Sequence, residues 1–261
     1  MVSDDDDVRQ TPWAEQQRLL ENAGGINGLV EKLEETEAVY DLTGKEPIIV
    51  CIDERIIATS KGKGEMYYYV RSAGTFILLD EESRKAFLES SGAKIATWHK
   101  ECGAATKKYG ETHSGAESSP EDIDAYAQNF VESLKEELDL ETREIGIESP
   151  GFHPAIGVIY QGVDMDPFQI DPELPKFFGI NRNHTPKKYA LEELQIALDI
   201  AFGDHGFNDL FDEENPFYII VAGNPNNPDL CADILCSEVN SVLENTSYKE
   251  KVLVKAYDAR I

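Results

Sequence analysis

Three side chains with catalytic potential follow one buried strand near the start of the chain. Residues 48–52 read Ile-Ile-Val-Cys-Ile, an apolar and mostly β-branched run that predicts a core strand. Cys51, Asp53 and Arg55 stand at alternating positions, and side chains two apart in an extended chain lie on the same face. The spacing therefore predicts a thiol, a carboxylate and a guanidinium side by side where this strand ends.

A second pair of candidate metal ligands, His99 and Cys102, follows another predicted strand at residues 93–98. Two thiolates and one imidazole form a common open zinc site, in which the fourth position is left for water or substrate. Cys102 is expected to begin a helix, where exposed N–H groups favour a thiolate. We therefore predict that Cys51, His99 and Cys102 hold one Zn²⁺ ion per chain.

Asp53 and Arg55 have a predicted role beside that metal. Asp53 can accept a hydrogen bond from a zinc-bound water and so orient the hydroxide that forms from it. Arg55 can hold Asp53 ionised and aimed through a bidentate pair. The same carboxylate could instead swing onto the metal and close the site. The plainer alternatives are a structural salt bridge at a strand end, a buried pair of thiols and a core histidine.

The elements around these residues predict a mainly parallel α/β fold. Strands are expected at residues 48–52, 66–70 and 93–98, and a helix at residues 80–90. Alternating strands and helices are typical of a parallel sheet with crossover helices. Ligands of such sheets bind at the carboxyl ends of the strands, which is where both halves of the predicted metal site fall. Arg71 ends the middle strand and is expected to tie the site loop to neighbouring carbonyl groups.

The rest of the chain is expected to belong to one domain, residues 12–261, since the sequence shows no internal repeat. Residues 1–11 read as a disordered acidic leader, and residues 12–40 as a helical arm with Thr11 as N-cap and Pro12 in its first turn. Residues 164–183, rich in proline and aspartate, are expected to cross the surface. Further helices are predicted at 119–138, 189–202 and 230–243, and further strands at 155–160, 216–222 and 251–257.

The composition argues against several classes of partner and location. The 261 residues include 24 basic and 50 acidic side chains, and the net charge of −26 argues against nucleic acid and anionic membrane surfaces. Four cysteines without a C-x-x-C pair do not suggest a disulfide-dense secreted scaffold. The N-terminus lacks the pattern of a signal peptide, and no apolar run approaches the ~20 residues of a membrane span. We therefore expect a soluble, cytoplasmic protein with reduced thiols.

Taken together, these motifs resemble those of the β-class carbonic anhydrases. That family has C-x-D-x-R, then R-N-A-G, then H-x-x-C-G after a strand. The corresponding residues here are Cys51-x-Asp53-x-Arg55, Arg71-x-Ala73-Gly74 and His99-x-x-Cys102-Gly103. The resemblance covers residues 48–106, the metal-site core lying within 48–110. Ser72 and Thr75 stand where the family usually has asparagine, and the chain after about residue 110 does not follow the family.

The resemblance implies a β-carbonic-anhydrase-like fold with N-terminal helices and a C-terminal extension. It implies reversible hydration of carbon dioxide to bicarbonate, with Asp53 and Arg55 as the catalytic dyad beside the zinc. Gly103 would offer its backbone N–H to bicarbonate. Subunits of this family usually form dimers with exchanged N-terminal helices. A homodimer or higher homo-oligomer is therefore expected, with residues 12–39 as the exchanged arm.

Two alternative functions stay open. Related enzymes of this fold hydrolyse carbon disulfide or carbonyl sulfide, and a zinc-containing protein could bind bicarbonate without catalysis. Among the remaining candidates, Cys231 and Cys236 are expected to be core residues rather than a second metal site. Any of four histidines could carry protons away: His113, His153, His184 and His205.

Overall fold

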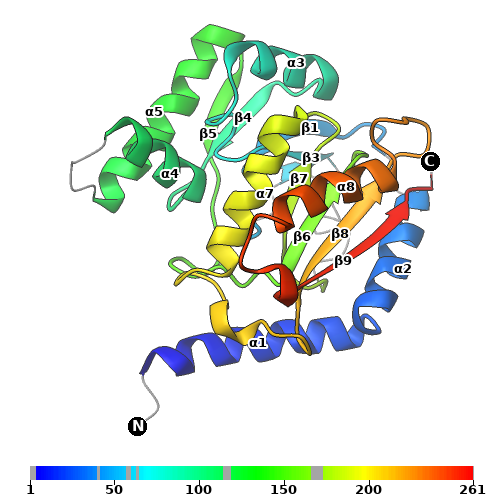
Figure 1. The fold of residues 1–261 in the computed structure, drawn as a ribbon. Helices are drawn as coiled ribbons and strands as arrows, with labels where there is room; N and C mark the ends of the chain where they lie inside the picture. The colour runs from blue at the N-terminus through cyan, green and yellow to red at the C-terminus, as the bar shows by residue number, and fades with distance from the viewer. Residues whose placement is uncertain are drawn as a thin grey trace.

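Two mainly parallel sheets form the fold of this chain (Figure 1). The structure is a computed structural model that describes residues 4–39, 42–56, 60–62, 65–113, 119–165 and 173–260. One sheet has five strands in the order β2-β3-β1-β4-β5, and the other has four in the order β7-β6-β8-β9. Among these strands only the β2–β3 pairing is antiparallel. The expected α/β class with a mainly parallel sheet is therefore confirmed.

The first sheet carries the candidate metal site. Its strands are β1 (Glu46–Val50), β2 (Ser60–Gly62), β3 (Glu65–Arg71), β4 (Ile95–Trp98) and β5 (Glu141–Glu144). Its helices are α3 (Glu81–Ser91), α4 (Gly103–Thr112) and α5 (Pro120–Leu138). Asp80 caps α3 by accepting from the Ser83 N–H, and Gly92 ends it at a φ of 67°, which glycine adopts without strain. These caps are local signals, which is why the helix follows the predicted boundaries.

The second sheet is covered on one face by two helices (Figure 1). Its strands are β6 (Gly157–Gln161), β7 (Phe177–Asn181), β8 (Phe217–Gly223) and β9 (Val252–Asp258). The covering helices are α7 (Lys187–Ala201) and α8 (Ala232–Leu243), and short 3-10 turns lie at Asn208–Leu210 and Lys249–Lys251. Every residue of β6, β7 and β8 is buried, as in parallel strands enclosed on both faces.

β7 corrects the expectation that residues 164–183 only cross the surface. Phe177–Asn181 is a buried strand that pairs in parallel with β6. Its apolar run, Phe-Phe-Gly-Ile, is only four residues long and follows a proline-rich stretch, so the sequence resembles that of a loop. Residues 166–172 lie outside the described residues.

The two sheets have the same connection order. Apart from the short antiparallel strand β2, each sheet has four parallel strands. The first of these along the chain pairs with the second and third, and the third pairs with the fourth. A helix joins the second and third strands in both cases, α3 in one and α7 in the other. The amino-acid sequence shows no internal repeat, but the structure has the same strand connections twice. We call residues 46–144 the N-terminal unit and residues 157–258 the C-terminal unit.

Individual hydrogen bonds also match between the units. The last residue of β1 accepts at its carbonyl from Ser72 N, and the last residue of β6, Gln161, accepts from Asn183 N. The last residues of β4 and β8 accept likewise from Ile145 N and Ala259 N. The strand registers agree, since Val50 pairs with the last residue of β3 and Gln161 with the last residue of β7. Val50 therefore aligns with Gln161, and Trp98 with Gly223, at the carboxyl edges of the two sheets.

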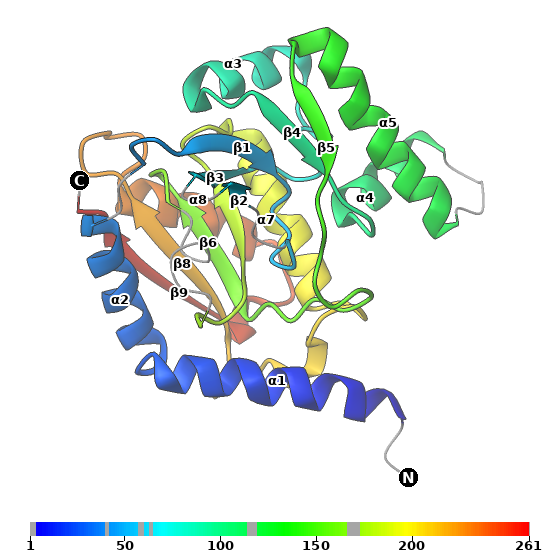
Figure 2. The same cartoon turned by 180° about the vertical axis from the view of Figure 1, so that it is seen from behind.

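An N-terminal arm of two helices lies along the C-terminal unit (Figures 1 and 2). The arm consists of α1 (Asp4–Asn22) and α2 (Gly25–Val39). Trp13 packs edge-on against Phe207 and Phe211, with ring centroids 4.8 and 5.4 Å away. The expected helical arm is therefore present, and it belongs in space to the C-terminal unit.

The start of this arm differs from the sequence expectation. Residues 4–11, expected to be a disordered leader, lie within α1, and Pro12 lies inside the helix rather than in its first turn. Aspartates at a helix N-terminus are favoured by the helix dipole, so an acidic run can begin a helix as well as remain disordered. Residues 1–3 lie outside the described residues.

One acidic side chain is buried between the two units. Glu193 of α7 accepts hydrogen bonds at Oε1 from the Ala73 N–H at 2.7 Å and the Ser72 hydroxyl at 3.2 Å. Its Oε2 makes no hydrogen bond with the described residues. Burial raises the pKa of Glu193 to about 8, and the two hydrogen bonds oppose this only in part. The folded chain therefore holds a proton here that an unfolded chain releases.

We expect this carboxyl to make the fold less stable as the pH rises. An unfolded glutamate has a pKa of ~4.3, so between that value and about 8 the folded state binds more protons and the free energy of unfolding falls. Glu193→Gln should remove this part of the pH dependence, on the order of a few kcal/mol. Denaturant unfolding of both proteins across this range measures it, with the exposed Glu136→Gln as control. Equal pH slopes for wild type and Glu193→Gln would contradict the raised pKa.

Candidate metal centre

The structure brings the three expected metal ligands together. Cys51 directly follows β1, His99 directly follows β4, and Cys102 is the N-cap of α4. Their ligand atoms all lie within 4.8 Å of one another, with the two sulfur atoms 3.9 Å apart, and all three side chains are buried. β1 and β4 are neighbouring parallel strands, so their carboxyl ends meet at one edge of the sheet. This group could hold a metal ion.

The imidazole of His99 fits a metal-binding role. Its Nδ1 lies 2.8 Å from the Lys100 carbonyl oxygen, and because a carbonyl only accepts, Nδ1 carries the proton. In the neutral imidazole, Nε2 then presents a lone pair, and this atom is buried and makes no hydrogen bond with the described residues. Leaving a buried polar atom unpaired costs ~1–3 kcal/mol, and a bound metal ion would remove that cost. A backbone carbonyl on the other ring nitrogen is a usual way to orient a metal-bound histidine.

The two thiols also fit such a role. Their mutual hydrogen bond and burial raise the pKa of Cys51 well above its ordinary value. The same hydrogen bond lowers the pKa of Cys102, helped by the N–H groups of Ala105 and Ala104 at the start of α4. Gly74 N donates to Cys51 Sγ at 3.2 Å. Since metal binding needs both thiolates, it should release the proton held between the sulfur atoms.

Asp53 and Arg55 form a buried bidentate pair next to these ligands. Arg55 Nε donates to Asp53 Oδ1 at 3.0 Å and Nη2 to Oδ2 at 2.7 Å. Burial alone would raise the pKa of Asp53, but the bonds from Arg55 and the nearby His99 and His153 hold that pKa well below its usual range. Asp53 Oδ2 lies 3.9 Å from His99 Nε2. An ionised carboxylate therefore faces the side of the histidine where a metal ion would bind.

Arg71 fixes the backbone under this pair, as expected from the sequence. Its Nη1 donates to the carbonyl oxygens of Cys51 at 3.2 Å and Asp53 at 3.1 Å. The arginine side chain passes so close to Gly179 of β7 that a Cβ there would lie 2.3 Å from Arg71 Cδ. Arg71 N donates to Asn181 Oδ1 at 2.7 Å. A strand of the C-terminal unit therefore makes room for the arginine that holds the site.

Sequence reasoning missed the acidic partners of this centre. Glu101 Oε2 accepts from Arg55 Nη1 at 3.1 Å and from Gly151 N at 2.6 Å. Glu54 is buried, and both its carboxylate oxygens lie 3.2 Å from Nδ1 of His153. Asp53, Glu54 and His153 also lie close enough to form a second possible metal group, but Arg55 already engages both oxygens of Asp53. Glu54 and His153 are 99 residues apart, so no local pattern could have paired them.

A cavity of about 460 Å³ lies beside the centre and is lined by both halves of the chain. Arg55 and Gly103 contribute from the N-terminal unit, Ile200 from α7, and His153 and His205 from connecting segments. A Cβ at Gly103 would lie 2.8 Å from Ile200 Cδ1, so a larger residue would crowd this wall. The N–H of Gly103 belongs to the first turn of α4, where backbone donors lack partners within the helix.

The other candidate residues lie away from the centre. His113 stacks on Tyr109 at the end of α4, and His184 is bonded to Ser90 and Asp164. Cys236 packs against the hydrophobic core, and Cys231 donates to the Pro228 carbonyl. In the part of the chain that the structure describes, neither cysteine belongs to a possible metal group.

The C-terminal unit does not repeat the ligand set. With Val50 aligned to Gln161 and Trp98 to Gly223, Cys51 corresponds to Gly162 and His99 to Asn224. Cys102 corresponds to Cys231, because each is the N-cap of the helix that follows. A Cβ at Gly162 would lie 2.7 Å from the Leu230 carbonyl oxygen, so a ligand side chain does not fit there.

The chain was compared with family models, curated proteins and solved structures, and none of them matches it. Among the described residues, no helix is both long and apolar enough to cross a membrane.

We expect each chain to bind one metal ion at Cys51, His99 and Cys102. Cys102→Ser should weaken binding by more than the ~10–100-fold typical of an outer-shell change, because a ligand is lost. Cys231→Ser, the matching N-cap position in the C-terminal unit, should keep the full metal content. Elemental analysis and competition with a chelator measure both. Two ions per chain, or metal loss in Cys231→Ser, would contradict a single site.

Proposed function

We propose that this protein is a zinc enzyme that catalyses the reversible hydration of carbon dioxide to bicarbonate. The observation that carries the proposal is a two-cysteine, one-histidine group with a bidentate Asp–Arg pair 3.9 Å from the free histidine nitrogen. Such a donor set suits Zn²⁺ and leaves one position open for chemistry. Structural zinc sites usually have four protein ligands. Three ligands with an ionised carboxylate beside them therefore favour a catalytic site.

The metal would activate water, and side chains and backbone groups of the protein would orient the reacting atoms. When bound, Zn²⁺ lowers the pKa of a coordinated water from ~15.7 toward ~7 and so supplies a nucleophile at neutral pH. Arg55 keeps Asp53 ionised, so this carboxylate would be placed to accept a hydrogen bond and orient the attacking group. The Gly103 N–H, at the positive end of α4, donates to the oxygen on which charge develops.

His153 is the residue best placed to carry the released proton. His153 lines the cavity, and its Nδ1 lies 3.9 Å from Asp53 Oδ1. Imidazole is the side chain that exchanges protons between pH 5 and 8. Glu54 holds the ring in this position. The proton can then leave through the cavity, whose wall also includes His205.

Hydrolysis of carbon disulfide or carbonyl sulfide is a second candidate on the same centre. Pro120, Ile123 and Ile200 give the cavity an apolar wall, which suits any small linear molecule of this kind. Binding of bicarbonate without catalysis is the third. Stopped-flow assays with carbon dioxide, carbon disulfide and carbonyl sulfide on zinc-loaded protein separate the three. Carbon dioxide turnover supports our proposal, turnover of only the sulfur compounds favours the second, and no turnover with full zinc favours the third.

Asp53→Ala should leave zinc bound and reduce carbon dioxide turnover by about 10²–10³-fold, the usual effect of losing one preorganised hydrogen-bond partner. Asp164→Asn is the matched control, because Asp164 occupies the corresponding position three residues after β6. It should keep wild-type activity. Metal analysis and stopped-flow hydration measure both effects. An active Asp53→Ala enzyme would exclude the proposed role of the dyad.

His153→Gln should lower kcat by about 10-fold or more while leaving kcat/KM for carbon dioxide nearly unchanged, since proton transfer follows the hydration step. Glutamine keeps a donor for Glu54, so the fold should be retained. Added imidazole buffer should restore kcat. His205→Gln, a change in the same cavity wall, should have the smaller effect. If kcat and kcat/KM fell together without rescue, His153 would be structural.

A further inference from the structure

We propose that the C-terminal unit takes the place of a second subunit, so that the protein is a monomer with one metal centre. The two units share their strand order but only one keeps a ligand set. The way they pack is that of two related subunits about a two-fold axis. This inference concerns assembly and metal content, and it does not depend on which substrate the centre takes.

Equivalent residues of the two units touch each other. Arg71 ends β3 and pairs with the last residue of β1, and Asn181 ends β7 and pairs with the last residue of β6. The Arg71 N–H donates to Asn181 Oδ1 at 2.7 Å. In a two-fold interface the residues on the axis meet their own counterparts. Arg71 and Asn181 therefore mark the position of a pseudo-two-fold axis.

Contacts on either side of this axis are reciprocal. Glu193, on the crossover helix of the C-terminal unit, bonds to the loop after β3 at Ser72 and Ala73. Ser90, on the crossover helix of the N-terminal unit, bonds at 2.8 Å to His184 in the loop after β7. Each helix thus contacts the same loop of the other unit. Reciprocity of this kind defines an isologous interface, the form that closes a dimer.

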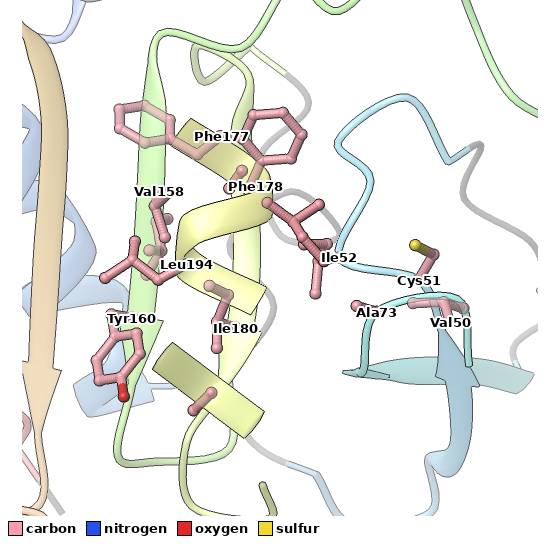
Figure 3. Close-up of a cluster of buried hydrophobic side chains, with 14 of the residues drawn as sticks. Val50, Cys51, Ile52, Ala73, Val158, Tyr160, Phe177, Phe178, Ile180 and Leu194 are labelled. Atoms are coloured by element: carbon pink, nitrogen blue, oxygen red, sulfur yellow. The ribbon is translucent and has the colours of Figure 1, made fainter. Parts of the chain in front are cut away.

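The contact between the units is a continuous apolar core. Figure 3 shows Ile52, the residue after Cys51, lying between the end of β1 and the side chains of Phe178 and Val158. Its carbonyl oxygen accepts from Gly179 N at 3.1 Å. One hydrophobic cluster includes residues of both units. Interfaces of permanent dimers resemble a domain core cut in half, and this one has that character within a single chain.

The N-terminal arm crosses from one unit to the other. It directly precedes the N-terminal unit in sequence but packs on the C-terminal one (Figure 2). Gln16 Oε1 accepts from Lys176 N at 2.7 Å, and Glu34 pairs with Arg260 at 3.1 Å. In a two-chain assembly this would be an exchanged arm. Here the exchange is completed inside one chain, so no second copy is needed for it.

In the C-terminal unit, the position that corresponds to the metal centre is filled by protein atoms, as expected of a unit that acts only as a partner. The Leu230 carbonyl lies where a side chain at Gly162 would begin, and Asp258 Oδ1 accepts from Ala232 N at the start of α8 at 3.0 Å. At the corresponding helix start in the N-terminal unit, the N–H groups of Ala104 and Ala105 donate to the Cys102 thiol instead. The C-terminal unit therefore keeps the interface and supplies Ile200 to the cavity wall, but holds no metal.

The C-terminal unit thus already covers the surface of the N-terminal unit that a second chain would bind. Sedimentation equilibrium of the metal-loaded full chain over a wide concentration range should give the 29.1 kDa mass of one chain, with one metal ion each. This differs from the homodimer expected from the resemblance. A stable dimer, or metal loss on dilution as a dimer separates, would overturn the proposal.

A pair of variants tests whether the C-terminal unit supports the metal centre as a subunit would. Asn181→Ala removes the axial contact to Arg71 and should weaken metal binding at least tenfold, measured by chelator competition, although it touches no ligand. Asn226→Ala, on an exposed turn of the same unit, should leave metal affinity unchanged. Equal metal affinity in Asn181→Ala and wild type would contradict the partner role, whatever the outcome of the carbon dioxide assay.

Discussion

The candidate metal centre depends on two hydrogen bonds from Arg71. After β1 ends, the carbonyl oxygens of Cys51 and Asp53 leave the sheet ladder but stay buried, and buried carbonyl groups need donors. Arg71 supplies one to each. Cys51 and Asp53 are therefore held at fixed positions relative to each other before any metal arrives. The same arginine requires a glycine at position 179, which ties the geometry of the centre to a strand of the second sheet.

A second constraint is the balance of buried charge around Asp53. A buried carboxylate without a partner would cost several kcal/mol, and truncating one member of a buried pair is correspondingly destabilising. Arg55 neutralises Asp53 through two bonds and also reaches Glu101. These contacts leave Asp53 little freedom to rotate. An ionised and immobile acceptor next to the metal-binding side of His99 is the preorganised group that the proposed chemistry requires.

Sequence reasoning was reliable where the signal is local. Two features depend on neighbouring residues and could be predicted: the alternation of Cys51, Asp53 and Arg55 after an apolar run, and the start of a helix at Cys102. The grouping of His99 with both thiols could be predicted because neighbouring parallel strands end at one edge of a sheet. The structural similarity of the two units could not be predicted from the sequence. Its most recognisable residues are ligands, and the second copy has Gly162 and Asn224 in their places. The two units have only their strand order in common, and strand order cannot be read from short apolar runs in a sequence.

Contacts between distant segments were equally hidden. Nothing near His153 in the sequence indicates that it faces Glu54, because the backbone of His153 is held by a hydrogen bond to the distant His205 carbonyl. The acidic run at residues 4–7 shows the opposite problem. The same residues suit disorder and a helix start, and the packing of Trp13 farther along α1 decides between them.

The two units differ in backbone strain, measured by the number of non-glycine residues with a positive φ angle. Thr75, Phe76 and Glu101, all in loops of the metal-binding unit, have φ angles of 48°, 77° and 56°, which L residues adopt only at a cost. The same unit holds the unpaired Nε2 of His99. Within residues 157–258 as described, Asn208 alone among non-glycine residues has such a φ, and asparagine tolerates it best. Backbone strain therefore occurs in loops next to the metal ligands, whereas the C-terminal unit has the cost of a buried Glu193 oxygen that has no hydrogen-bond partner among the described residues.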